Sequence, residues 1–309
     1  MYVERPPSAG LAGRVACGWH RISEAAGTQL VVPDACVDLI WGAEGLYVAG
    51  PDTGPMPATI AAGETLAGVR FRPGAVGDFF GLPLQELRDR RVPLSDLPVG
   101  AVLLTELTKA AETWRTAPSP RRRPAHAADA FAERKASTPA RLPEADAFAE
   151  RGTSTLARLP EAVAFAERGT STLARLPEAL AFASLRAQVE ARLQLLQAAV
   201  ARRLSPTAAA PSVDPAAPAI ATALGEGRTV AEVAWDLGYS ERQLHRRSLL
   251  AFGYAPKTLQ RIIRFQHALR LARTGIPLAQ VAITAGYTDQ AHLSNDVKRL
   301  SGVQLSRLL

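Results

Sequence analysis

Two segments of this 309-residue chain decide its fold: VAEVAWDLGYSE at residues 230–241 and LAQVAITAGYTD at residues 278–289. They share Ala, Val, Ala, Gly and Tyr at an offset of 48 residues, and most other positions match by type. Each segment predicts a helix that ends at a glycine able to adopt positive φ, Gly238 or Gly286. Ser240 or Thr288 then caps a second helix whose first turn carries an acid. This order of elements is typical of a helix-turn-helix motif.

The helices after these caps carry polar side chains on one face. With Leu244 pointing inward in the first, and Leu293 and Val297 in the second, helical spacing leaves a solvent-facing set on each. Arginine suits guanine, and glutamine or asparagine suits adenine, by paired hydrogen bonds in the major groove of DNA. The candidate base-reading residues are Arg242, His245 and Arg246, and then Gln290, Ala291, Ser294 and Asn295. Their neighbours Arg247, His292, Lys298 and Arg299 complete the candidate DNA-binding set.

Charge is concentrated in the same part of the chain. Residues 219–309 hold twelve Lys and Arg against six Asp and Glu, a net +6 out of +7 for the whole chain. Such a balance favours a polyanionic partner. A solvated helical face is the ordinary explanation of scattered charges, but the paired units disfavour it here. Residues 256–274 predict an amphipathic helix of roughly 18 residues, about 27 Å long, which would hold the two polar faces near one DNA turn apart, about 34 Å.

This arrangement resembles the DNA-binding domain of the AraC/XylS family of transcriptional regulators. The resemblance covers about 90 residues and rests on both Gly-Tyr-Ser/Thr turns, the segment FGYAPK at 252–257 and GYTDQAHL at 286–293. It implies an all-α domain with two helix-turn-helix units and a sequence-specific regulator that reads bases with the residues named above. Three positions depart from the family pattern: Ser248 and Val297 replace the usual Phe, which predicts a looser core, and Asn295 stands where Arg is common.

Residues 1–97 predict a small β-rich (α+β) domain. Turn-forming stretches separate apolar runs that read as strands, and helices are expected at 75–80 and near 84–90. The predicted strands are Gln29–Val32, Val37–Trp41, Leu46–Ala49 and Leu66–Phe71. YVERPP at 2–7, VPDACVDLIW at 32–41, GPDT at 50–53 and GVRFRPG at 68–74 resemble the N-terminal domain of a group of actinobacterial AraC-like regulators. That resemblance implies a sensor or dimerisation domain.

A candidate ligand site in this domain combines Asp34 and Asp38 with Arg70 and Arg72, which could neutralise an anion. Turn formation and surface exposure explain the same residues equally simply. Trp19 and Trp41 are expected in the core. The two cysteines, Cys17 and Cys36, are too few for a four-thiolate zinc site, and buried thiols are favoured over a redox pair.

The middle of the chain predicts a helical linker over 98–204. A 17-residue unit repeats over 128–178, as ADAFAERKASTPARLPE, ADAFAERGTSTLARLPE and AVAFAERGTSTLARLPE. The array is either an interaction arm or an expanded linker of short helices. Apolar spacing predicts a long helix at 185–204. Four prolines within 205–218 then predict a tether that leads to the DNA-binding domain at 219–309.

The sequence favours a cytoplasmic, non-enzymatic regulator. It contains no nucleophile elbow, phosphate loop or His-Glu-x-x-His pattern, so we expect no catalytic residues, cofactor or metal. The sequence contains no run of 18 apolar residues, so no membrane span is expected. The expected partner is double-stranded DNA, with a small-molecule effector at the N-terminal domain, RNA polymerase and a second copy of the chain as further candidates. The alternative is an interaction or scaffold protein that uses the repeat arm, with DNA binding secondary.

Overall fold

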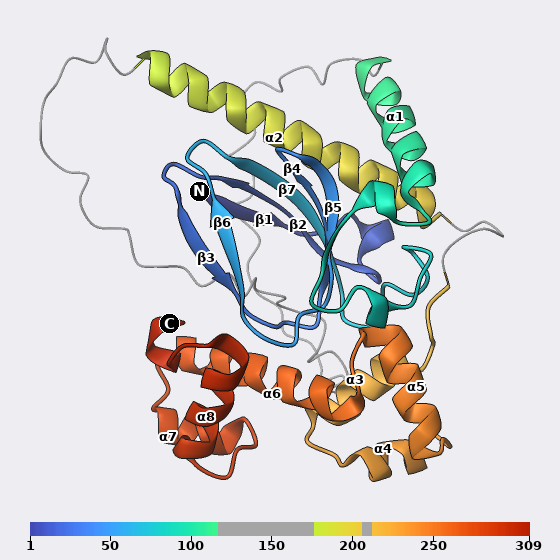
Figure 1. Ribbon diagram of the computed structural model, residues 1–309, viewed down its shortest axis with the longest axis vertical. Coiled ribbons are helices and arrows are strands. Elements are labelled where there is room, and N and C mark those ends of the chain that lie inside the picture. Colours follow the sequence, from blue (N-terminus) through green and yellow to red (C-terminus); the bar gives the residue numbers. More distant parts are fainter. Residues whose placement is uncertain (117–175, 206–211) are drawn as a thin grey trace, which may run out of the picture.

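The computed structural model describes residues 1–116, 176–205 and 212–309 (Figure 1). The N-terminal part contains a six-stranded antiparallel sheet, in the order β1-β2-β7-β4-β5-β8, and a separate two-stranded sheet of β3 and β6. The strands are β1 (Tyr2–Arg5), β2 (Val15–Ile22), β3 (Gly27–Val31), β4 (Val37–Gly42), β5 (Gly45–Ala49), β6 (Met56–Ile60), β7 (Thr65–Phe71) and β8 (Arg91–Pro93). The four predicted strands are β3, β4, β5 and β7, within one or two residues at each end.

The helices predicted in the N-terminal domain are wrong. Residues 75 and 76 have no regular structure, residues 77–80 form a turn, and the region 84–90 contains only a single 3-10 turn, Leu84–Glu86. The reason is that Gly74, Gly77 and Gly81 all adopt positive φ, at 74°, 58° and 77°, which interrupts a right-handed helix. The irregular segment directs Phe79 and Phe80 into the core, where they pack against Phe71.

Two helices of the predicted linker pack onto the N-terminal sheet. Helix α1 (Gly100–Thr116) contacts α2 (Leu176–Arg203), and α2 lies across β2 and β7 (Figure 1). Gly18 allows this approach, because a side chain there would collide with Leu193 and Gln197 of α2. The long helix predicted at 185–204 is therefore present, but it forms part of the N-terminal core. The repeats at 128–178 lie outside the described residues, apart from the first residues of α2.

The C-terminal part consists of helices arranged around one long central helix. They are α3 (Ala217–Gly225), α4 (Val230–Asp236), α5 (Glu241–Phe252), α6 (Pro256–Arg273), α7 (Leu278–Thr284) and α8 (Gln290–Ser301). Helix α6 contacts α3, α5, α7 and α8, and its buried residues include Leu259, Ile262, Phe265 and Leu269. The structure thus contains the amphipathic helix predicted from Pro256, while α3 begins inside the predicted tether.

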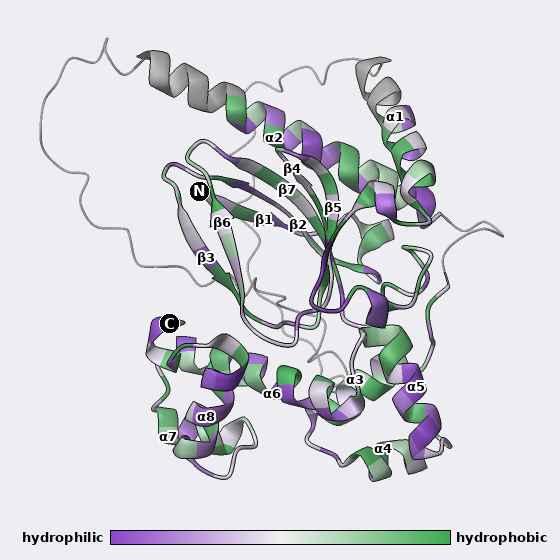
Figure 2. Cartoon of the chain, in the orientation of Figure 1, coloured by the Kyte–Doolittle hydropathy of each residue, from purple (hydrophilic) through white to green (hydrophobic). Residues whose placement is uncertain are grey.

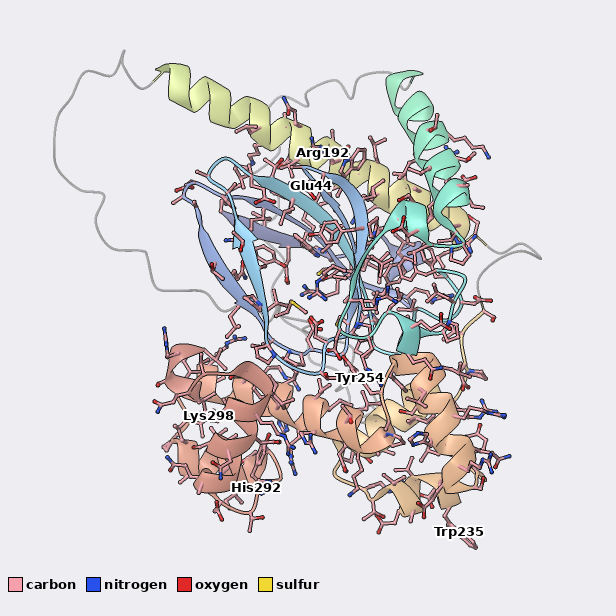
Figure 3. The ribbon with its side chains drawn as sticks, viewed as in Figure 1. Glu44, Arg192, Trp235, Tyr254, His292 and Lys298 are labelled. Carbon is pink, nitrogen blue, oxygen red and sulfur yellow. The ribbon has the colours of Figure 1, made fainter. Side chains whose placement is uncertain are left out.

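The two parts of the chain share a buried contact region. Tyr254, in the turn between α5 and α6, is fully buried, and its hydroxyl donates to the backbone carbonyl of Asp52 at 2.7 Å (Figure 3). Val32 and Ala35, from the loop between β3 and β4, belong to the same apolar cluster as the C-terminal helices. The Gln266 side chain of α6 donates to the carbonyl of Pro33 in that loop. The β-sheet region is therefore packed directly against the helical part.

His20, on the side of the sheet that α2 covers, is a buried polar side chain that lacks hydrogen bonds to the described residues. His20 of β2 is fully buried, and neither ring nitrogen has a hydrogen-bond partner within the described parts of the chain. Burial lowers the pKa of His20; Glu190 raises this pKa, and Arg5, Arg186 and the N-terminal ammonium lower it further. Folding therefore favours the neutral form of the imidazole.

We expect the folded state to lose stability in mild acid through His20. Because its folded pKa lies below the ordinary value of about 6.5, the unfolded state takes up the proton first as the pH falls. The neutral His20 makes its full contribution to the free energy of unfolding above about pH 6.5, and this contribution is lost as the pH falls through the folded pKa. Urea unfolding near pH 7.5 and pH 5 should therefore show a weaker pH dependence in His20→Leu than in the wild type. Equal dependence in both proteins would contradict this assignment.

Candidate nucleic-acid interface

The first helix pair, α4 and α5, has the turn that its sequence predicts. Thr229 caps α4 in a reciprocal capping box with Glu232, and Ser240 caps α5 in another with Gln243. Gly238 between the helices has φ 69°, a conformation that side chains disfavour. Ala234 is buried at the crossing. Local sequence alone therefore determines where α5 begins and how it is directed.

The second pair, α7 and α8, differs at its cap. The prediction that Thr288 caps the helix is wrong: Asp289 does so, accepting from the backbone N–H of His292 at 2.7 Å. The cap must be the last extended residue before the helix, and Asp289 has φ −162° and ψ 175°. The Thr288 hydroxyl instead lies 3.3 Å from Nδ1 of His292. One more residue therefore separates Gly286 from α8 than separates Gly238 from α5.

Both helices present the predicted polar faces. Leu244, Leu293 and Val297 are buried as expected, and Figure 2 shows the half of α5 next to α4 as hydrophilic. Nine of the eleven predicted site residues are exposed to solvent. These are Arg242, His245 and Arg246 on α5, and Gln290, Ala291, Ser294, Asn295, Lys298 and Arg299 on α8.

The cations of these helices fall into two groups. Arg242, Arg246, Lys298 and Arg299 form no ion pair within residues 1–116, 176–205 and 212–309. Arg247, in contrast, donates to Asp214 at 2.8 Å and lies over the ring of Tyr239, 4.5 Å from its centroid. The hydrogen bond to Asp214 raises the pKa of Arg247. Arg247 therefore holds α5 to the segment before α3, and the other four are available to a partner.

His292 is likewise occupied inside the domain. Its half-buried ring meets the edge of Tyr287 at a centroid distance of 5.2 Å, and it faces the Thr288 hydroxyl. Figure 3 shows it on the same helix pair as Lys298. Of the eleven predicted site residues, only Arg247 and His292 form side-chain hydrogen bonds, ion pairs or ring contacts with other residues that the structure describes.

A buried carboxylate that the sequence did not reveal fastens the second pair to α6. Asp296 accepts from Arg264 at 3.1 Å and from the Tyr287 hydroxyl at 3.3 Å. The Arg264 guanidinium also covers the Tyr287 ring, 4.2 Å from its centroid. Burial raises the pKa of Tyr287, so the hydroxyl remains a donor. Asp296 follows Asn295 directly, and helical spacing alone places it next to the polar face.

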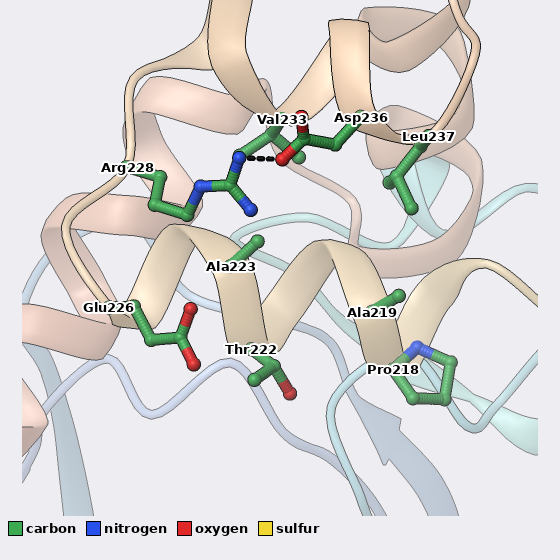
Figure 4. Close-up of a pocket in the computed structure, with 9 residues that line it drawn as sticks. All are labelled: Pro218, Ala219, Thr222, Ala223, Glu226, Arg228, Val233, Asp236 and Leu237. Carbon is green, nitrogen blue, oxygen red and sulfur yellow. Dashed lines mark ion pairs between the residues drawn. The ribbon is translucent and has the colours of Figure 1, made fainter.

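A hollow of about 360 Å³ lies between α3 and α4 (Figure 4). Its walls are mainly apolar, with Val233 and Leu237 on α4 and Ala219 and Ala223 on α3. An ion pair between Arg228 and Asp236 lies at its rim. None of the predicted site residues lines this hollow, so it is separate from the polar faces of α5 and α8.

Of the four residues of the candidate ligand site in the N-terminal domain, three lie together. Arg70 is buried and pairs with Asp38 at 3.0 Å, and it lies 3.9 Å from Asp34 and 3.8 Å from Glu4. Burial raises the pKa of Asp34, and Arg70 opposes that change. Arg72 lies outside the cluster and donates instead to the carbonyl of Ala12. The cluster is therefore a buried cation among three carboxylates.

Of the two cysteines, which are expected to be buried, Cys17 is buried and Cys36 is partly buried. Both are free thiols, and burial raises the pKa of Cys17 to about 12 and that of Cys36 well above its ordinary value. Trp19 is buried beside Cys17 as expected, whereas Trp41 is only partly buried. Within the described residues, no group of three or more His, Cys, Asp or Glu could hold a metal ion.

Comparison with known proteins gives two family matches. Residues 233–309 match the family described as a helix-turn-helix domain, and residues 3–93 match a domain of unknown function, DUF6597. No curated protein matches the chain. None of the helices in the described part of the chain is long and apolar enough to cross a membrane.

Solved structures of ToxT from Vibrio cholerae also match. One, at 13% identity and a TM-score of 0.35, covers 94% of this chain and 98% of that chain. A second, an apo variant, has 10% identity and a TM-score of 0.39, and covers 99% of this chain and 100% of its own. A third was solved with (E)-4-(8-methylnaphthalen-1-yl)but-3-enoic acid bound, at 10% identity and a TM-score of 0.31, covering 93% and 92%.

The helical part with its polar faces is thus a DNA-binding domain of the kind found in transcription regulators. More particularly, the C-terminal part of the chain is an AraC-type helix-turn-helix domain, and it follows an N-terminal domain of the DUF6597 family.

The cap assignment in the second pair can be tested directly. Asp289→Ala removes the side chain that accepts the His292 N–H and should cost about 0.5–2 kcal/mol of stability. Thr288→Ala, one residue earlier, is the matched control and should cost less than half as much. Urea unfolding of the full chain measures both. A larger loss for Thr288→Ala would show that the threonine is the cap.

Proposed function

We propose that this protein is a transcription regulator that reads two successive major-groove segments of one DNA duplex, with α5 and α8 as its reading helices. Each reading helix follows a tight glycine turn and starts at a side-chain cap, as in helix-turn-helix units. In this proposal Lys298 and Arg299 contact phosphates, and Arg242, His245, Arg246, Gln290, Ala291, Ser294 and Asn295 face base edges.

The observation that carries this proposal is a set of exposed side chains that form no hydrogen bond or ion pair with the described residues of the chain. Cations in a folded domain are commonly paired or solvated, and here Arg247, Arg261 and Arg264 are paired with Asp214 or Asp296. Two of the four unpaired cations named above, Arg242 and Arg246, lie on one face of α5 at a spacing of four residues. Guanidinium groups in that position match the phosphates and guanine edges of a major groove.

Helix α6 supplies the spacing between the two reading helices. Its 18 residues correspond to about 27 Å, and α5 and α8 pack at its two ends. That length is compatible with contacts about one helical turn apart on the same face of the duplex. The scaffold alternative depends on the repeats at 128–178, and the features described above do not favour it.

The N-terminal domain is proposed to sense a small molecule and to transmit the signal through the loop of residues 32–36. Asp34 of this loop lies beside buried Arg70, while Val32, Ala35 and the carbonyl of Pro33 contact the C-terminal helices. Ala35 has φ 63°, a strained conformation for a residue with a side chain. A ligand that displaces Asp34 from Arg70 would therefore move a segment packed against α6. RNA polymerase and a second copy of the chain remain further proposed partners.

Salt dependence tests the DNA-binding function. Phosphate contacts release counterions, so the affinity of the full chain for a duplex selected from a random pool should fall linearly on a log–log plot as salt rises. Lys298→Gln and Arg299→Gln should each reduce the slope by about 1. Lys109→Gln on α1 is the control and should leave the slope unchanged. Fluorescence anisotropy measures all four proteins, and absence of salt-dependent binding to any duplex would overturn the proposal.

A double-mutant cycle tests transmission through the loop. Asp34→Asn weakens the pairing with Arg70, and Gln266→Leu removes the hydrogen bond from α6 to Pro33. If the loop couples the two parts, Asp34→Asn should change operator affinity in the wild-type background and much less in the Gln266→Leu background. Additive effects on the binding free energy would show that this loop does not transmit the change.

A further inference from the structure

Equivalent positions in the two reading helices are separated by one residue more than the alignment of the two sequence segments indicates. The turn glycines Gly238 and Gly286 are 48 residues apart, but the caps Ser240 and Asp289 are 49 apart. The same spacing of 49 separates the C-terminal caps, Gly253 and Gly302, which both adopt the left-handed conformation. Within the helices, equivalent positions are therefore 49 residues apart.

The buried positions confirm this register. Leu244 and Leu293 are 49 residues apart, as are Ser248 and Val297, and all four side chains are buried. At the offset of 48, Leu244 would correspond to the half-buried His292 instead. The shift thus comes from the one additional residue between Gly286 and α8.

This register pairs three exposed positions. Arg242 corresponds to Ala291, His245 to Ser294 and Arg246 to Asn295. All six residues are exposed, and within the described parts of the chain none of these side chains has a hydrogen bond or ion pair. The two helices therefore present different chemistry at the same three places.

The next position along each helix belongs to the fold in both units. Arg247 and Asp296 are 49 residues apart. Arg247 is held by Asp214 and Tyr239, and Asp296 by Arg264 and Tyr287. Arg246 and Asn295 therefore occupy equivalent, outward-facing positions, each directly before the internally paired residue of its helix.

We infer that the two units read different bases: guanine by Arg246 of α5 and adenine by Asn295 of α8. Arginine donates two hydrogen bonds to O6 and N7 of guanine, whereas asparagine donates to N7 and accepts from N6 of adenine. Ala291, in place of Arg242, offers a methyl group that suits the thymine methyl. The operator is then asymmetric, with a guanine-containing segment about one helical turn from an A·T-containing segment. This inference rests on the proposed DNA-binding function.

Reciprocal substitutions test it in the full chain. Duplexes are first selected from a random pool with the wild-type protein, and single-base variants of the selected site then compete at fixed salt. Arg246→Asn should shift the preference at one position from guanine to adenine, and Asn295→Arg should shift the other from adenine to guanine. Each correct pair is expected to discriminate by about 5- to 150-fold, and each substitution should leave the other segment's preference unchanged.

The outcomes separate the inference from the function beneath it. Both residues are exposed, so thermal unfolding should show that the variants fold like the wild type. Lys298→Gln is the control for a phosphate contact and should weaken all duplexes equally. Unchanged base preferences in both reciprocal variants, or a wild-type site that repeats one sequence in both segments, would overturn the inference while DNA binding stands. A wild-type chain that binds no duplex even at low salt would overturn both.

Discussion

The burial of Tyr254 between the two parts of the chain is the contact on which the arrangement depends. The Gly253 carbonyl accepts from Arg88, and the Tyr254 hydroxyl reaches the carbonyl of Asp52, whose side chain pairs with Arg91 at 2.7 Å. A buried hydroxyl without such a partner would cost about 1–3 kcal/mol. Ser248 donates to the carbonyl of Tyr254 at 2.7 Å. The serine that replaces the expected Phe in α5 therefore secures this turn.

If α5 and α8 read DNA as proposed, this contact connects the N-terminal domain to both helices through α6. The residues that follow Tyr254 begin α6, and α6 packs against both α5 and α8. The loop with strained Ala35 contacts the same helix through Gln266. In the proposed mechanism, a change in the Arg70 cluster reaches α5 and α8 through the loop of residues 32–36 and the packed side chains of α6. Coupling of that kind requires two arrangements of the loop that differ in energy by a few kcal/mol.

Features fixed by neighbouring residues could be predicted from the sequence, whereas features fixed by distant contacts could not. The glycine turns, the Ser240 cap and the buried Leu244 and Leu293 follow from neighbours a few residues away, and the structure contains them. The prediction that Thr288 caps α8 was wrong because either of two adjacent residues could serve as the cap, and the packing of the helix selected Asp289. The prediction of a helix at 75–80 was wrong because three glycines allow the backbone to leave the helical conformation and to place Phe79 and Phe80 in the core. The position of α2 depended on a surface more than a hundred residues away, which no local pattern contains.

By itself, the sequence determined that this chain has a basic C-terminal domain with two duplicated turns, and which side chains face solvent on α5 and α8. Periodicity and capping chemistry act within about one helical turn, so they can be read from residues in order. Only the tertiary structure decided which cations remain free, because Arg247 and Arg264 find their partners through contacts distant in sequence. It also decided the register of 49 residues between α5 and α8, since packing of Leu293 and Val297 against the core sets the rotation of α8.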